Sequence, residues 1–237
     1  MYAASVTDPL GRPVKAAYGI VRSGGVKTAV MEMSAASGLP LLLPDELNPW
    51  ITSTYGTGEM ISDALNRGCR KFLVGIGGSA TNDAGTGMLS ALGVRFLDSS
   101  GQRLKGCGRD LESIARIDMS SLMPAARESE FIVACDVNTL FCGPDGAARV
   151  FAPQKGADPQ TAEALDRGMR SFAQVIAGQF QTDIVPLSGA GAAGGLGGAF
   201  KAFLNARLTA GIEMVLDAIA FDSLLEGADL VITGEGR

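Results

Sequence analysis

The chain contains no histidine among its 237 residues. Histidine is the usual proton acceptor near neutral pH and a common zinc ligand, so its absence excludes mechanisms that use it as a base and disfavours zinc sites of the Cys/His kind. The four cysteines, Cys69, Cys107, Cys135 and Cys142, form no CxxC pair. Four scattered thiols in a chain of this length predict reduced cysteines in a cytoplasmic protein rather than a disulfide framework.

Long apolar runs and an excess of positive charge are also lacking. No uninterrupted apolar stretch reaches 18 residues, and the N-terminal segment has neither a basic start nor a long apolar run. We therefore expect no membrane span and no signal peptide. The formal net charge is −5 and basic runs are absent, which argues against a nucleic-acid or anionic-membrane partner. We expect small-molecule partners, and a homo-oligomer is left open.

Glycine, by contrast, is abundant, with 32 residues that fall in clusters and indicate tight turns. Hydrophobic patterning predicts strands at residues 3–7, 15–20, 26–33, 71–76, 95–97, 102–104, 131–135 and 229–233. It predicts helices at residues 60–65, 84–92, 161–180, 199–204 and 211–220. Because strands and helices alternate along the chain, the class is α/β or α+β.

The glycine-rich turn Gly75-Ile-Gly-Gly-Ser-Ala-Thr-Asn-Asp83 follows a predicted buried strand and precedes a predicted helix. Backbone amides in such a turn can point at an anion, and the start of the helix adds a positive dipole end. The turn lacks the Gly-Lys-Ser/Thr of a Walker A loop and the third glycine of a dinucleotide fingerprint. A tight turn that Ser79 or Asn82 caps explains the same residues.

Four further segments carry candidate site residues. Asp136 follows an apolar strand, where α/β proteins often place a metal-binding or basic carboxylate, although a turn or cap explains it too. Lys155 would reach a phosphate as a point charge, or lie exposed in a loop. Residues 189–198 are rich in glycine, which indicates either a ligand site or close backbone packing. In the segment 233–237, Glu235 and Arg237 would contact a ligand or form a polar turn.

Six blocks, taken together and in this order, resemble the bacterial glycerate kinase family. They are Thr54-Tyr-Gly-Thr-Gly-Glu59, the glycine-rich turn, Ala134-Cys-Asp-Val137, Val150-Phe-Ala-Pro-Gln-Lys-Gly-Ala157, Gly189-Ala-Gly-Ala-Ala-Gly-Gly195 and Asp229-Leu-Val-Ile-Thr-Gly-Glu-Gly-Arg237. The blocks are co-linear over nearly the whole chain. Ala84 and Ala152 stand where the family commonly has glycine, and these are small departures.

The resemblance implies an ATP-dependent kinase with an alcohol group as acceptor, which converts D-glycerate to 2-phosphoglycerate with Mg²⁺. The residues alone leave a 2- or a 3-phosphate product open. The resemblance also implies an α/β fold with two domains. Residues 1–225 would form a mixed α/β domain inserted into a flavodoxin-like domain, and residues 226–237 would form the first strand of the return to it.

Family resemblance also supplies roles for the candidate site residues. The expected catalytic residues are Asp83, Asp136 and Lys155, and either aspartate would orient the glycerate hydroxyl or hold Mg²⁺. The expected substrate- and phosphate-binding residues are Gly77, Gly78, Ser79, Thr81, Asn82, Gly191, Gly194, Glu235 and Arg237. The sequence leaves the metal ligands unassigned.

The family's Ser-Phe-Lys-Gly and Asp-Gly-Gly-Glu-Gly segments, and its continuation after Gly-Glu-Gly-Arg, do not occur in this sequence. We therefore expect a chain cut at both ends that is inactive, or nearly so, by itself. Two rival classes remain open. One is a dehydrogenase that binds a dinucleotide at the glycine-rich turn, with Asp98 as the nearest ribose ligand. The other is a non-catalytic binding or assembly domain.

Overall fold

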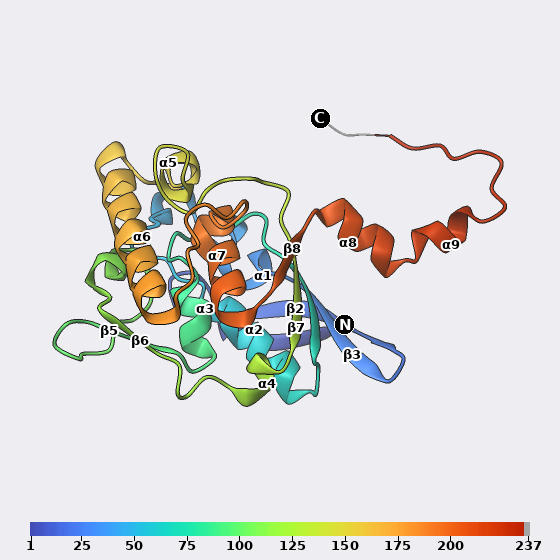
Figure 1. Ribbon diagram of the computed structural model, residues 1–237, viewed down its shortest axis with the longest axis horizontal. Coiled ribbons are helices and arrows are strands. Elements are labelled where there is room, and N and C mark those ends of the chain that lie inside the picture. Colours follow the sequence, from blue (N-terminus) through green and yellow to red (C-terminus); the bar gives the residue numbers. More distant parts are fainter. Residues whose placement is uncertain (235–237) are drawn as a thin grey trace.

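The computed structural model describes residues 1–234, which are built around a six-stranded sheet with the order β1-β2-β3-β4-β7-β8 (Figure 1). The strands are β1 (Tyr2–Thr7), β2 (Pro13–Ser23), β3 (Val26–Glu32), β4 (Lys71–Gly75), β7 (Glu130–Ala134) and β8 (Arg207–Thr209). The pairs β1–β2 and β2–β3 are antiparallel, whereas β3, β4, β7 and β8 run parallel. This mixed sheet with interspersed helices confirms the predicted α/β class.

The connections between the parallel strands contain most of the helices. These are α1 (Ser34–Ser37), α2 (Tyr55–Asn66), α3 (Thr86–Ala91), α4 (Pro124–Arg127), α5 (Ala147–Phe151), α6 (Pro159–Phe180) and α7 (Ala192–Leu204). Short 3-10 helices lie at Leu39–Leu41, Pro44–Glu46, Gly108–Ser113 and Pro153–Lys155. Because neighbouring parallel strands run in the same direction, each crossover starts at the carboxyl end of a strand. Several loops therefore gather at the carboxyl edge of the sheet.

Helix α6 shows why the sequence was informative about local structure. The carboxylate of Asp158 accepts a hydrogen bond from the Thr161 amide at 2.6 Å, and Pro159 occupies the first turn, where its missing N–H costs nothing. Gln181 ends the helix in a left-handed conformation. The apolar stripe predicted for residues 161–180 is buried against the rest of the protein, so this prediction is confirmed.

Phenylalanine side chains pack together in the core between the central strands and the helix α7. The Phe72 ring on β4 stacks on Phe131 of β7 with centroids 4.6 Å apart, and Phe131 meets Phe200 of α7 at 5.8 Å. All three side chains are almost completely buried. These contacts fix α7 against the middle of the sheet, and therefore fix the position of the glycine-rich segment at its start.

Two predicted elements differ from the structure. Residues 102–104 form no named strand, although the Asp98 amide donates to the Gln102 carbonyl and the Leu104 amide donates to the Phe96 carbonyl beside a bridge between Leu97 and Arg103. The strand partner of β5 (Arg95–Leu97) is instead β6 (Arg116–Asp118). The turn between the two predicted strands is held by the Asp98 carboxylate, which accepts from the amides of Ser100 and Gln102. Residue patterns specify strand character, but they do not specify which strand provides the backbone partner.

The second difference is the strand predicted at residues 229–233. In the structure, residues 226–234 are irregular and follow α8 (Gly211–Ala218) and α9 (Phe221–Leu225). Within residues 1–234 no strand pairs with it, and an extended segment needs such a neighbour to satisfy its backbone groups.

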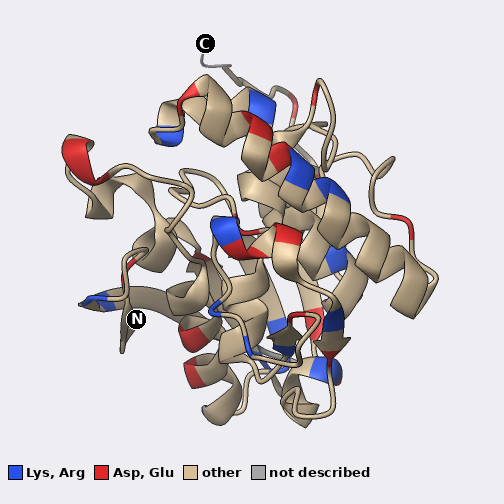
Figure 2. Cartoon of the chain, turned by 90° about the vertical axis from the view of Figure 1, so that its left-hand side faces the viewer, with Lys and Arg blue, Asp and Glu red and all other residues tan. Residues whose placement is uncertain are grey.

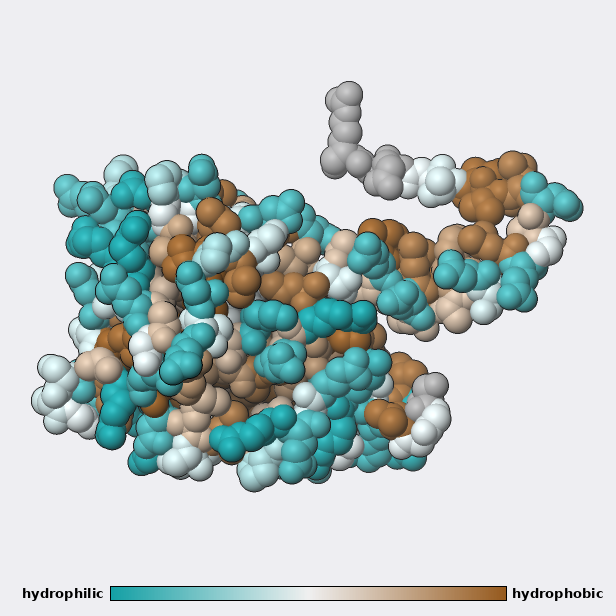
Figure 3. All heavy atoms as spheres, viewed as in Figure 1, coloured by the Kyte–Doolittle hydropathy of each residue, from teal (hydrophilic) through white to brown (hydrophobic). Residues whose placement is uncertain are grey.

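Helices α8 and α9 extend away from the body as an arm (Figure 1). Apolar side chains gather on this arm and on the segment after it (Figure 3). They include Ile212, Val215, Leu224 and Ile232, the last of which is 88% exposed. None of the helices described in residues 1–234 combines the length and the apolar character that a bilayer crossing requires.

Candidate functional site

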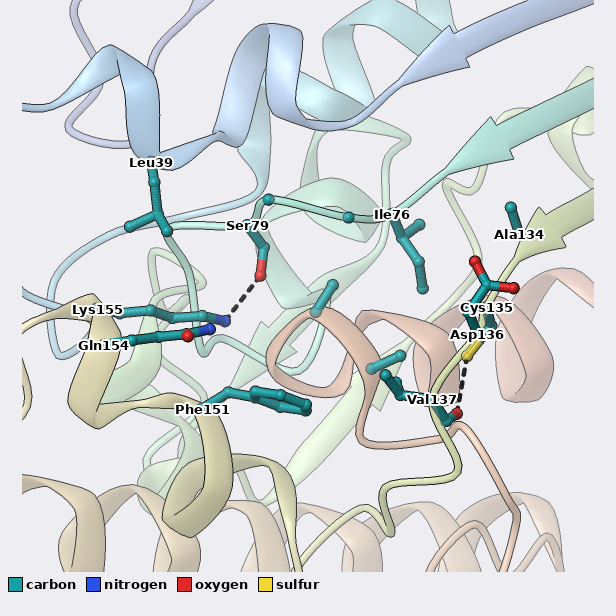
Figure 4. A pocket seen from close by; sticks show the side chains of 14 residues that line it. Leu39, Ile76, Ser79, Ala134, Cys135, Asp136, Val137, Phe151, Gln154 and Lys155 are labelled. Carbon is teal, nitrogen blue, oxygen red and sulfur yellow. Dashed lines mark hydrogen bonds between the residues drawn. The ribbon is translucent and has the colours of Figure 1, made fainter. Parts of the chain in front are cut away.

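A pocket of about 240 Å³ opens where β4 and β7 end (Figure 4). The turn after β4 contributes Gly77, Gly78 and Ser79 to it, and the loop after β7 contributes Asp136. Lys155 enters from the 3-10 helix Pro153–Lys155. The carboxyl ends of parallel strands are the usual ligand position in open α/β sheets. Ala192 and Ala193, from the glycine-rich block 189–195, line the pocket as well, so the structure brings four of the predicted blocks together at one site.

The glycine-rich turn is held by backbone hydrogen bonds on both sides of Ser79. The Leu39 amide donates to the Gly78 carbonyl, and the Ala80 amide donates to the Ser37 carbonyl, each at 2.9 Å. Within residues 1–234, no backbone carbonyl accepts from the amides of Gly77, Gly78 or Ser79. Gly78 has a φ of +69°, and the side of Gly77 on which a Cβ would stand is open space. Free amides beside open space suit an anion.

Lys155 places a buried amine at the edge of this pocket. Its side chain is 1% exposed, and its Nζ donates to Ser79 Oγ at 2.7 Å and to the Thr81 carbonyl at 2.6 Å. Burial disfavours the ammonium form and lowers the pKa of Lys155 to about 7, against the opposing effect of the Asp83 charge. The loop alternative for Lys155 is thus wrong, because the side chain points inward (Figure 4).

Asp83 has a different environment from the one expected for a group that contacts substrate. Its carboxylate accepts from the Thr54 amide at 2.7 Å, from Thr54 Oγ1 at 2.8 Å, and from the amides of Gly85 and Gly87 at 3.0 and 3.2 Å. The side chain is 0% exposed and does not line the pocket. Burial raises the pKa of Asp83, and these hydrogen bonds oppose the rise. The Asp83 carboxylate thus bonds to backbone and hydroxyl groups around the turn and does not face the pocket.

Asp136 does line the pocket and is exposed. Its Oδ1 accepts from the Gly211 amide at 2.7 Å, at the start of α8. The carboxylate thus bonds to the beginning of the arm, and Figure 4 shows it across the pocket from Lys155. Of the two predicted aspartates, only Asp136 has a side chain that a ligand in this pocket can reach.

Thr81 and Asn82 lie in the same turn but are completely buried. The side-chain Nδ2 of Asn82 donates to the Met169 sulfur at 3.2 Å. Thr81 Oγ1 and Asn82 Oδ1 have no hydrogen-bond partner among the described residues. The Thr81 carbonyl is the atom that contacts Lys155. Neither of these two predicted ligands lines the pocket.

The glycine-rich start of α7 packs against this turn. A Cβ on Gly191 would lie less than 3.0 Å from the Leu140 carbonyl, and one on Gly194 less than 3.0 Å from the Thr81 carbonyl. The Ala84 amide donates to the Gly194 carbonyl at 2.9 Å. Gly191 and Gly194 do not line the pocket. Close backbone packing, rather than ligand contact, explains these two glycines.

Gly194→Ala is expected to lower the free energy of unfolding by about 2–3 kcal/mol, because the new Cβ would overlap the Thr81 carbonyl at a φ of +67°. Urea unfolding followed by circular dichroism measures this change. Gly143→Ala is the matched control, since Gly143 has a φ of +104° but no atom within 4 Å of the added Cβ. Equal losses for the two variants would contradict the packing role of Gly194.

Several pocket residues carried no signal of their own in the sequence. Leu39, Phe151 and Gln154 line the pocket, but ordinary apolar or polar residues cannot be assigned to a site by type. Thr54, which holds Asp83, lay in a block of the family resemblance and had no predicted role. Glu235 and Arg237, predicted as ligands, lie outside the described residues.

On the face that Figure 2 shows, Lys and Arg are interspersed with Asp and Glu. The charges that line the pocket within residues 1–234 are those of Lys155 and Asp136. Fold and pocket together define an α/β protein with a partly polar pocket at the carboxyl edge of a mostly parallel sheet.

The chain belongs to the glycerate kinase family, whose model matches residues 1–237. It is 48% identical over 232 residues to the glycerate kinase of Bacillus subtilis strain 168, and 45% identical over 232 residues to the glycerate 2-kinase of Escherichia coli K12. Each alignment covers 98% of this chain and 60% of the relative. The chain thus spans about three fifths of the length of these relatives.

A crystal structure assigned to glycerate kinase 2 of Salmonella typhimurium LT2 has the same fold. The TM-score is 0.94 at 46% sequence identity, and the match covers 100% of this chain and 63% of that one. These matches confirm the family that the six sequence blocks predicted.

Proposed function

We propose that the protein is a glycerate kinase that transfers the γ-phosphoryl group of ATP to D-glycerate and forms 2-phosphoglycerate. The observation that carries this proposal is the buried Lys155 amine beside the free amides of a glycine-rich turn. The names of the relatives, glycerate kinase and glycerate 2-kinase, support the same activity. A dinucleotide-binding dehydrogenase is less well supported, because Asp98 closes a turn with its carboxylate.

Phosphoryl transfer depends on positioning and on neutralising charge more than on covalent chemistry. The amides of Gly77 and Gly78, with the Ser79 hydroxyl, would hold a phosphate or the glycerate carboxylate. Lys155 would stabilise the negative charge that develops during transfer, in a position from which water is largely excluded. The burial of Lys155 supports this role, because the interaction of a cation with an anion is stronger in a low-dielectric site.

The described residues contain no group of three or more His, Cys, Asp or Glu side chains that could hold a metal ion. Mg²⁺ in kinases is bound by one or two carboxylates together with substrate phosphates. Among residues 1–234, Asp136 is the one carboxylate that lines the pocket, and it would hold a magnesium ion that arrives with the nucleotide. The ion would neutralise phosphate charge when bound. Without that role, Asp136 would orient the glycerate hydroxyl.

We also propose that residues 1–225 form a domain inserted into a flavodoxin-like domain. Residues 226–237 would be the first strand of the return to that second domain. The exposed apolar side chains of the arm and of residues 230–232 support this arrangement, since such surfaces are normally covered. A chain that lacks the second domain would show little or no turnover.

Ligand binding by this chain is testable by thermal shift. We expect ATP–Mg²⁺ or D-glycerate to raise the melting temperature by about 5 °C or more at concentrations about 100-fold above Kd, since binding to the folded state contributes about 2.7 kcal/mol. NADH is the control for the dehydrogenase alternative. Stabilisation by NADH, with none from ATP–Mg²⁺ or D-glycerate, would contradict the proposed kinase.

A further inference from the structure

Ser79 and Lys155 form a hydroxyl–amine pair at the edge of the pocket. Ser79 Oγ and Lys155 Nζ are 2.7 Å apart, and both side chains line the pocket (Figure 4). The Thr81 carbonyl accepts a second hydrogen bond from the same Nζ at 2.6 Å. When the amine loses the proton that faces Ser79, the bond to Thr81 keeps its lone pair directed at the hydroxyl. A nucleophile, a base and a third group that orients the base are the parts of a nucleophilic site.

The same pocket supplies donors for an oxyanion. Within residues 1–234 the amides of Gly77, Gly78 and Ser79 have no backbone acceptor, and open space lies beside Gly77. Amides next to a nucleophilic serine stabilise the negative oxygen of a tetrahedral intermediate. The turn is held by the hydrogen bonds of Leu39 and Ala80 to its flanks, so these donors are positioned before any ligand binds.

We propose that Ser79, with Lys155 as its base, is a covalent nucleophile that takes the acyl group of small activated carboxylic esters. The bond that forms joins Ser79 Oγ to the acyl carbon, and the bond that breaks joins that carbon to the leaving oxygen. The Ser79 proton passes to Lys155 Nζ and from there to the leaving group. No oxidant, reductant or metal takes part. The inference is independent of the proposed kinase activity, since it needs neither ATP nor glycerate.

The charges around Lys155 are compatible with a base. Asp83 is the carboxylate whose charge acts on the amine, and burial outweighs its effect, so the pKa of Lys155 falls to about 7. Asp136 and Cys135 line the pocket further from Lys155, at the end of β7. A neutral amine at physiological pH is what proton transfer from a serine requires.

The test incubates the 237-residue chain with 4-nitrophenyl acetate at pH 6, 7 and 8 and locates the acetyl group by peptide mass spectrometry. We expect one acetyl group on Ser79, formed about tenfold faster at pH 8 than at pH 6, because the neutral fraction of an amine with this pKa rises about tenfold. Ser79→Ala should abolish this modification. Lys155→Met should slow it by at least about 100-fold.

The chain offers an internal control of the same chemistry. Ser5 Oγ accepts from Lys15 Nζ at 2.6 Å, but both side chains are exposed on β1 and β2 and neither lines the pocket. Ser5 should remain unmodified. Acetylation of Lys155 itself, equal acetylation of Ser5 and Ser79, or no acetylation of Ser79 would each overturn the proposal. If Lys155→Met does not fold, the pH dependence and Ser79→Ala still decide it.

Discussion

Lys155→Met is expected to lower kcat/KM for the phosphorylation of D-glycerate by about 10³-fold. Removal of one preorganised donor to a developing negative charge typically costs about 10²–10³-fold, and Lys155 supplies such a donor in a buried position, whether its amine is neutral or protonated. Methionine has a similar length and no charge, so it fills the same space. A coupled assay of ADP release measures the effect in a hybrid in which these residues replace the 232 matched residues of the Bacillus subtilis enzyme.

The control for this substitution is Lys201→Met. Lys201 is also a lysine, it lies on α7 whose first turn borders the pocket, and its side chain is exposed. We expect it to leave kcat/KM within about twofold, because surface charges of this kind contribute little. A near-normal kcat/KM for Lys155→Met would remove this residue from the proposed machinery. A hybrid without glycerate kinase activity would instead count against the proposed function.

Asp83→Ala is expected to lower the free energy of unfolding by about 3–5 kcal/mol. The substitution leaves the Thr54, Gly85 and Gly87 amides buried without their acceptor, and each such group costs about 1–3 kcal/mol. Replacement by asparagine retains one acceptor oxygen and should cost less. Urea unfolding of the 237-residue chain, with fluorescence of Trp50 as the signal, measures both variants.

Asp145→Ala serves as the matched control, because Asp145 is exposed and a surface substitution of this kind usually changes stability by less than about 0.5 kcal/mol. A loss below about 1 kcal/mol for Asp83→Ala would show that the hydrogen bonds around Asp83 are not what holds the turn. If Asp83→Ala keeps normal stability but loses glycerate kinase activity, Asp83 takes part in the reaction itself.

Local structure followed largely from the sequence. The buried strand before the glycine-rich turn, the amphipathic stripe of α6 and the apolar strand that precedes Asp136 all occur where the periodicity predicted them. These elements are specified by neighbours within a few residues, because backbone hydrogen bonds and side-chain spacing of a helix or strand repeat over short distances. The six blocks also predicted the family, since their order is a property of the sequence alone.

The role of each glycine and aspartate could not be predicted in this way. A glycine indicates freedom of φ or close approach, but the sequence does not say whether a ligand or a backbone approaches it. For Gly191 and Gly194 the neighbours are carbonyl groups of Leu140 and Thr81. The extended segment at 229–233 is a similar case, because strand pairing depends on a partner elsewhere.

The sequence by itself determined the class of fold, the family and the glycine-rich turn between a buried strand and a helix, and it left open whether that turn binds an anion. Only the tertiary structure decided which polar groups face the pocket. Lys155 lies 76 residues from Ser79, and Asp83 lies 29 residues from Thr54. Burial and hydrogen-bond partners arise from such distant contacts, and they place Lys155 at the pocket and Asp83 beneath it, although both are charged residues in equally distinctive blocks.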